Sequence, residues 1–274
     1  MYYVYEGRTI RGIELMGWAL LVQVIAVIAQ GVTQAAFGLA FGSIVTNPAD
    51  LLGPFLVTLA ALCGIEIAEL GVAIVFLIGF FQAHAGRHEY GLEQSHSLER
   101  ALVLLIVFIV LSAVGVAFSV SSVFTPRLTG PAILPDVTGD LILAPLGAFF
   151  AGLTLVETIR SVSGEPVRSR LRFALGLGVV GAIVGPLLIL LATAGSIITV
   201  DLLTSGILAS AIAGQGISAI SLLLFWLAYR ETRRSLEAGT PAPVLPRIEQ
   251  LYPWLYRPVP PYSPPSAEFP PPKP

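Results

Sequence analysis

Residues 54–81 read PFLVTLAALCGIEIAELGVAIVFLIGFF, an apolar stretch that contains only two charged side chains. At a helical rise of about 1.5 Å per residue, roughly 20 apolar residues cross the hydrocarbon core of a bilayer. The stretch lacks the alternation of a barrel strand, and a lipid-exposed backbone has to satisfy its own hydrogen bonds. It therefore predicts a transmembrane helix.

Five further stretches of the same kind lie along the chain, at residues 12–44, 101–123, 141–159, 173–200 and 203–229. The 274 residues are 55% hydrophobic and only 12% charged, whereas soluble domains carry roughly 25% charged residues. Lipid therefore has to act as the solvent for much of the surface. The predicted fold class is all-α: a polytopic integral membrane protein, built as a bundle of six transmembrane helices.

The arginines predict the orientation of this bundle. Eleven of them flank the six stretches on one side, whereas Arg127 alone lies on the other side. Because positive residues collect in cytoplasmic loops, we expect residues 1–11 and the tail to be cytoplasmic, on either side of a transmembrane domain at residues 12–239. Arginine in place of lysine, with abundant Gly, Ala and Leu, is typical of a GC-rich prokaryotic genome, so the expected location is the cell membrane.

The tail, residues 240–274, is rich in proline and ends in PPYSPPSAEFPPPKP. Such a segment cannot form a helix and is predicted to be extended or disordered. Three interpretations are open, namely a solvated tail, a docking ligand for a partner protein, and a segment whose Trp and Tyr side chains lie against the membrane surface.

Glu66 and Glu69 are the strongest anomaly, because they are paired carboxyls inside an apolar stretch. Spaced three residues apart, they share one side of a helix, and an ionisable group in a membrane span marks a functional site by default. If they share one site, the pair can hold a proton or a small cation between them. The alternatives are a structural hydrogen-bonded pair inside the bundle and a solvated position at the outer interface.

Gln23, Gln30 and Gln34 in the first stretch are spaced by seven and four residues, which places them on one helical stripe. Buried amides need partners, and the two carboxylates of the next helix can provide them. The stripe predicts either interhelical hydrogen bonding or a polar path between the first two helices.

Two charged groups complete the set of candidates. His84, His88 and His96 fall in one cytoplasmic segment and are weak candidates for a zinc site, since they lack the fixed ligand pattern of known motifs. A second group, just before the fifth stretch, is a candidate for binding anionic lipid headgroups, although topology alone also explains it: Arg168, Arg170 and Arg172.

Several functions are disfavoured by the sequence. We find no P-loop, no zinc-protease motif, no serine-hydrolase motif and no dinucleotide fingerprint, so no enzyme activity and no cofactor are expected. The chain also lacks a basic face for nucleic acid. We expect a small transporter or channel-like protein for a proton, a cation or a small solute. The alternative is an accessory or scaffold protein that associates with itself or with another membrane protein through helix packing and the proline-rich tail.

Overall fold

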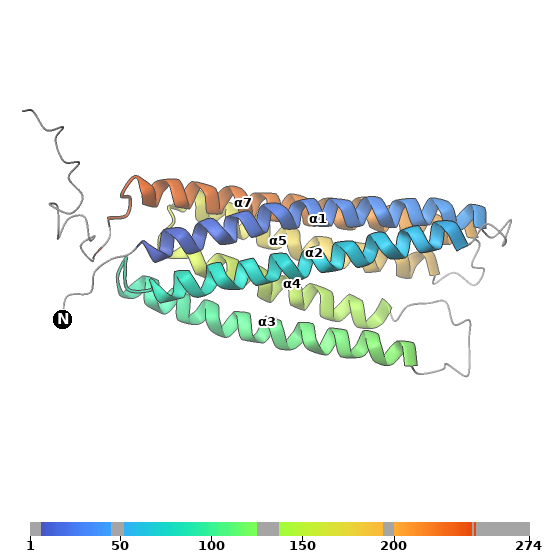
Figure 1. Ribbon diagram of the computed structural model, residues 1–274, viewed down its shortest axis with the longest axis horizontal. Coiled ribbons are helices and arrows are strands. Elements are labelled where there is room, and N and C mark those ends of the chain that lie inside the picture. The colour runs from blue at the N-terminus through green and yellow to red at the C-terminus, as the bar shows by residue number, and fades with distance from the viewer. Residues whose placement is uncertain (1–6, 45–51, 125–136, 194–199, 243, 245–274) are drawn as a thin grey trace, which may run out of the picture.

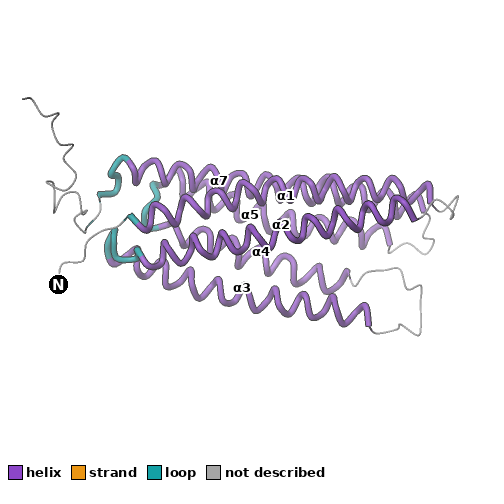
Figure 2. The backbone as a smooth tube through the Cα atoms, viewed as in Figure 1, coloured by secondary structure: helices purple, strands orange, loops and turns teal. Residues whose placement is uncertain are grey.

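The computed structural model describes residues 7–44, 52–124, 137–193, 200–242 and 244, and no strand occurs within these ranges. The chain folds into an elongated helical bundle (Figures 1 and 2). Its elements are α1 (Arg8–Ile44), α2 (Leu52–Ala85), α3 (Leu92–Phe124), α4 (Val137–Arg160), α5 (Glu165–Thr193), α6 (Val200–Ala209), the π-helical turn η2 (Ser210–Gly214) and α7 (Gln215–Glu237). Six helical spans in this part of the chain are long and apolar enough to cross a membrane, with α6, η2 and α7 forming the sixth.

The helices form a ring that is weakly closed on one side. Helix α1 packs against α2 and α7, α7 packs against α5, and α4 lies between α5 and α3. Helices α2 and α3, although consecutive in the chain, have few contacts with each other. The ring therefore has a thin seam between α2 and α3.

Eleven arginines lie at one end of the bundle, which we call the arginine-rich end. It holds the starts of α1, α3 and α5 and the ends of α2, α4 and α7 (Figure 1). The main cluster of buried hydrophobic residues also lies toward this end and includes Met16, Phe80, Leu98, Leu171 and Tyr229. Salt bridges join the helices here as well, between Arg170 and Glu231 and between Arg233 and Glu14.

Small residues allow the helices to approach closely. A methyl group added to Gly181 would lie 2.6 Å from the Ser218 hydroxyl oxygen, and one added to Gly214 would lie 2.9 Å from the Gly185 Cα. On the other side of α6, Gly38 faces Ile207 at 3.1 Å. These small-residue faces are used for packing inside the bundle.

One boundary differs from the sequence prediction. The fifth stretch was predicted to end at residue 200 and the sixth to begin at residue 203, but α5 ends at Thr193 and α6 already begins at Val200. Residues 194–199 and the proline-rich tail beyond Val244 lie outside the described residues. Hydropathy could not place this boundary because the apolar run continues across it.

Candidate functional site

A cavity of about 380 Å³ lies between α1, α2, α3 and α4, beside the thin seam of the ring. Its wall is almost entirely apolar and includes Leu20, Phe76, Leu105, Phe108 and Ala151. The polar side chains that line it are Gln23, Glu69 and Thr154. Ligand pockets commonly have this composition, with an apolar wall and a few polar groups that orient the ligand.

Glu69 and Gln23 are joined in the wall of this cavity. The Gln23 side-chain amide donates a hydrogen bond to the Glu69 carboxylate at 3.2 Å, and both side chains are half-buried. The Thr154 hydroxyl donates instead to the Phe150 carbonyl oxygen of its own helix at 2.8 Å. The carboxylate of Glu69 is therefore the charged group that a ligand in the cavity would meet.

Glu66 does not share the cavity with Glu69. Its side chain is exposed on α2 and does not line the cavity. Three residues advance a helix by about 300°, which leaves two side chains roughly 60° apart around the axis. That angle is large enough for Glu69 to face the cavity while Glu66 faces outward, so Glu69 is the member of the pair that lines the cavity.

Gln30 and Gln34 lie on α1 further from the carboxylates, and neither donates a hydrogen bond to Glu66 or Glu69. Helices α1 and α2 run in opposite directions, with Gln23 level with Glu69. Two helices with equal rise then place Gln30 about level with Leu62 and Gln34 about level with Thr58. Only the first glutamine of the predicted stripe therefore reaches a carboxylate.

The three histidines are not brought to one point. His84 is half-buried and lies 3.3 Å from the Arg87 guanidinium, His88 is exposed, and His96 lies 3.7 Å from Glu99. Within the described ranges, no group of three His, Cys, Asp or Glu side chains is arranged to hold a metal ion.

The three arginines before the fifth span have separate environments. Arg170 forms a salt bridge with Glu231 of α7 at 2.6 Å, so its charge is engaged within the bundle. Arg172 is exposed on α5. Arg168 instead lines a second pocket at the arginine-rich end and donates a hydrogen bond to the Arg160 carbonyl oxygen at 3.0 Å.

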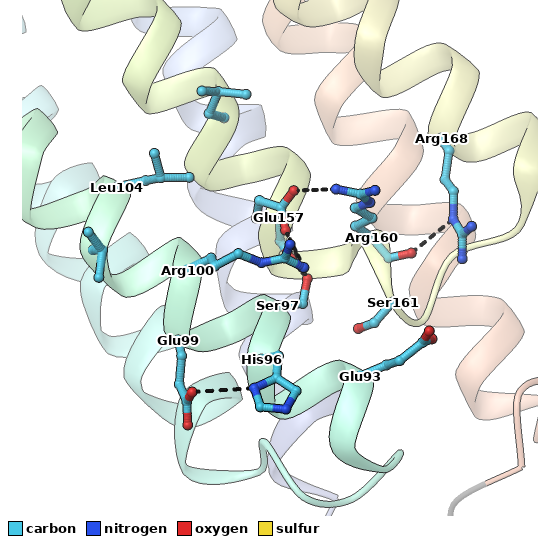
Figure 3. Close-up of a pocket in the computed structure, with 12 residues that line it drawn as sticks. Glu93, His96, Ser97, Glu99, Arg100, Leu104, Glu157, Arg160, Ser161 and Arg168 are labelled. Atoms are coloured by element: carbon cyan, nitrogen blue, oxygen red, sulfur yellow. Dashed lines mark hydrogen bonds and ion pairs between the residues drawn. The ribbon is translucent and has the colours of Figure 1, made fainter.

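Glu157 lines this second pocket and forms an ion pair with Arg160 of the same helix (Figure 3). That pair is present at 2.7 Å, and Arg100 of α3 adds a second ion pair at 3.2 Å. The Ser97 hydroxyl also donates to the Glu157 backbone carbonyl at 2.5 Å. The buried carboxylate of Glu157 therefore ties α3 to α4.

Glu89 has a structural role that the sequence did not reveal. It lies in the turn between α2 and α3, is only 4% exposed, and accepts hydrogen bonds from the backbone N–H groups of Arg8 and Thr9 at 3.0 Å each. The Thr9 hydroxyl donates to the Gly86 carbonyl oxygen at 3.1 Å. Glu89 thus caps the first turn of α1 from a distant part of the chain.

Burial raises the pKa of Glu89, and the hydrogen bonds from Thr9 and Arg8 only partly oppose this. A carboxyl with a raised folded-state pKa contributes stability that is fully present below its unfolded value of 4.5 and is lost as pH rises through the folded value. The free energy of unfolding of the detergent-solubilised protein should therefore fall as pH rises above 4.5. It should fall less steeply in Glu89→Gln. The exposed Glu93→Gln variant should keep the wild-type slope, and equal slopes in all three proteins would contradict this role.

Within the described residues, the geometry thus defines a helical bundle with six spans long enough to cross a membrane and with a carboxylate–amide pair in the wall of an apolar cavity. Comparison with protein-family models, with curated proteins and with solved structures found no match to this chain.

Proposed function

We propose that the protein is an integral membrane carrier for a small cationic or protonatable solute, with Glu69 and Gln23 as the binding pair. The membrane setting is supported by large apolar side chains that are more than half exposed around the bundle: Ile25, Val32, Ile67, Leu70 and Val103. Soluble monomers rarely expose apolar patches above a few hundred Å². The clustering of eleven arginines at one end supports cytoplasmic termini.

The depth of the binding pair supports a role in transport. If the hydrocarbon core begins near Gly12 and Phe81, Gln23 lies about 16 Å and Glu69 about 18 Å inside it at the helical rise. The middle of a core that is about 30 Å thick lies roughly 15 Å from either face. A carboxylate at this depth costs free energy, and such groups are therefore functional candidates by default. Secondary transporters bind their substrates near the midplane.

The lining indicates the chemistry of the solute. One carboxylate and one amide in an apolar wall fit a small molecule with a single cationic or hydrogen-bond-donating group and an apolar body. Protonation of Glu69 would release the charge interaction, so the same group can exchange a proton for the solute. The observation that carries the proposal is the Glu69–Gln23 hydrogen bond inside the cavity.

A carrier is preferred to a scaffold because the small-residue faces are already occupied. Gly178, Gly181 and Gly185 of α5 pack on η2 and α7, and Gly38 packs on α6, so the faces that these four glycines form are not free for a partner protein. We do not propose an enzyme, because the cavity brings no nucleophile and base together in its wall.

The direct test is flux in proteoliposomes. Purified protein is reconstituted into sealed vesicles, and uptake of small primary, secondary and tertiary ammonium compounds is followed with and without a proton gradient. Faster uptake than in protein-free vesicles, with proton movement in the opposite direction, is the expected result. Equal rates in both kinds of vesicle across this panel would contradict the proposed function.

A further inference from the structure

The second pocket, at the arginine-rich end, has a volume of about 860 Å³ and opens between α3, α4 and the start of α5 (Figure 3). Its lining changes character along the bundle axis. Val103, Leu104 and Leu153 form an apolar part that lies toward the middle of the bundle. Charged side chains occupy the part nearer the arginine-rich end. The pocket therefore combines an apolar groove with a charged mouth.

Three guanidinium groups lie where the groove becomes polar. Arg100, Arg160 and Arg168 have side chains that are 59%, 51% and 33% exposed. Glu157 is shared between Arg100 and Arg160, whereas Arg168 bonds a backbone carbonyl and lies 3.7 Å from the exposed Glu165. Each guanidinium has five N–H donors, so donors remain for a phosphate.

A carboxylate lies beyond these arginines, nearer the arginine-rich end of the bundle. Glu93 lies in the first turn of α3, lines the pocket and is exposed, and its side chain has no hydrogen-bond or ion-pair partner within the described part of the chain. Helical rise puts it about 10 Å from Arg100 along α3. Figure 3 shows its side chain extending toward the α4–α5 turn, on the same side as Arg168.

From this order of groups we propose that the pocket binds a phospholipid whose headgroup carries a primary amine. The acyl chains follow Val103, Leu104 and Leu153, the phosphate meets the three guanidinium groups, and the ammonium group donates hydrogen bonds to Glu93. This inference rests on the membrane setting of the proposed function but not on transport.

Other lipids fit this sequence of charges less well. A phosphatidylglycerol headgroup satisfies the arginines but brings no cation to Glu93. A choline headgroup carries a cation that cannot donate an N–H hydrogen bond. A soluble phosphoamine lacks the chains that would cover the apolar groove, so burying that surface favours the lipid.

The test is native mass spectrometry of delipidated full-length protein, with phosphatidylethanolamine, phosphatidylglycerol and phosphatidylcholine added at equal concentrations. The wild-type protein should retain phosphatidylethanolamine preferentially. Arg168→Gln should lower its retention about tenfold, since a charge-assisted interaction with phosphate is lost. Arg172→Gln, on the same helix but outside the pocket, should match the wild type. Glu93→Gln should still bind phospholipid but lose the preference for the ethanolamine headgroup over choline.

Three outcomes would overturn the proposal: equal retention in Arg168→Gln and wild type, an ethanolamine preference that survives Glu93→Gln, or equal binding of free phosphoethanolamine and the lipid. If Arg168→Gln does not fold, Arg168→Lys is used instead, because it keeps the positive charge and should retain the lipid. Failure of Arg168→Lys to retain the lipid would count against the site. Glu69→Gln should bind the lipid normally, so failure of transport and failure of this site are separate results.

Discussion

Replacing Glu69 by glutamine is expected to lower solute flux in proteoliposomes at least about tenfold, because the cation then enters an apolar cavity without its counter-charge. Glutamine has nearly the same size as glutamate, so the cavity keeps its shape and the Gln23 amide keeps an oxygen acceptor. The loss should therefore come from charge and proton exchange. Uptake and proton movement should decline together, and both are measured in the same vesicles.

The matched control is Glu66→Gln, which removes a carboxyl one helical turn away on α2. Because the Glu66 side chain is exposed and does not line the cavity, flux should stay close to the wild-type rate. Equal losses in the two variants would point to a general effect of charge in α2. Normal flux in Glu69→Gln would remove the carboxylate from the mechanism.

The second large effect is expected at Gly12, where α1 crosses α2. A methyl group added there would lie 2.5 Å from both the Ala83 backbone nitrogen and the Gly79 carbonyl oxygen. Backbone atoms cannot move aside as a side chain can. Gly12→Ala should therefore destabilise the bundle by about 1–3 kcal/mol, although alanine in place of glycine favours a helix by up to about 1 kcal/mol.

Gly17→Ala, five residues further along α1, is the control for this prediction. Its added methyl group would meet the nearest side-chain atom, the Cβ of Tyr229, at an ordinary 3.9 Å. The midpoint of thermal unfolding in detergent should fall for Gly12→Ala and remain at or above the wild-type value for Gly17→Ala. A Gly12→Ala midpoint equal to that of the wild type would show that the α1–α2 crossing is looser than described.

The helical fold could be predicted because length, hydropathy and arginine position all act locally along the chain. The six spans follow from apolar length, and the end that each loop occupies follows from its arginines. The start of α6 and the π-helical turn η2 could not be predicted, since hydropathy is continuous through both. The close approach of Gly214 to Gly185 depends on tertiary packing that no local pattern records.

The candidate site was predicted in part. The anomaly of carboxyls in an apolar helix led to Glu66 and Glu69 together, and helical spacing led to a stripe of three glutamines of which Gln23 bonds Glu69. Periodicity alone could not separate Glu69 from Glu66, because the two lie on the same broad side of α2 until the neighbouring helices are known. The capping role of Glu89 was missed because its partners lie about 80 residues earlier in the chain.

The measurement that tests the central claim most directly fills the cavity without changing any charge. Ala151 of α4 lines the cavity, whereas Ala144 of the same helix is exposed and lies outside it. Both Ala151→Phe and Ala144→Phe are reconstituted at equal density, and flux is compared once each shows a wild-type unfolding midpoint. If the solute passes through the cavity, Ala151→Phe should lose most of its flux while Ala144→Phe keeps it. Full flux in folded Ala151→Phe would contradict the claim that the solute passes through this cavity.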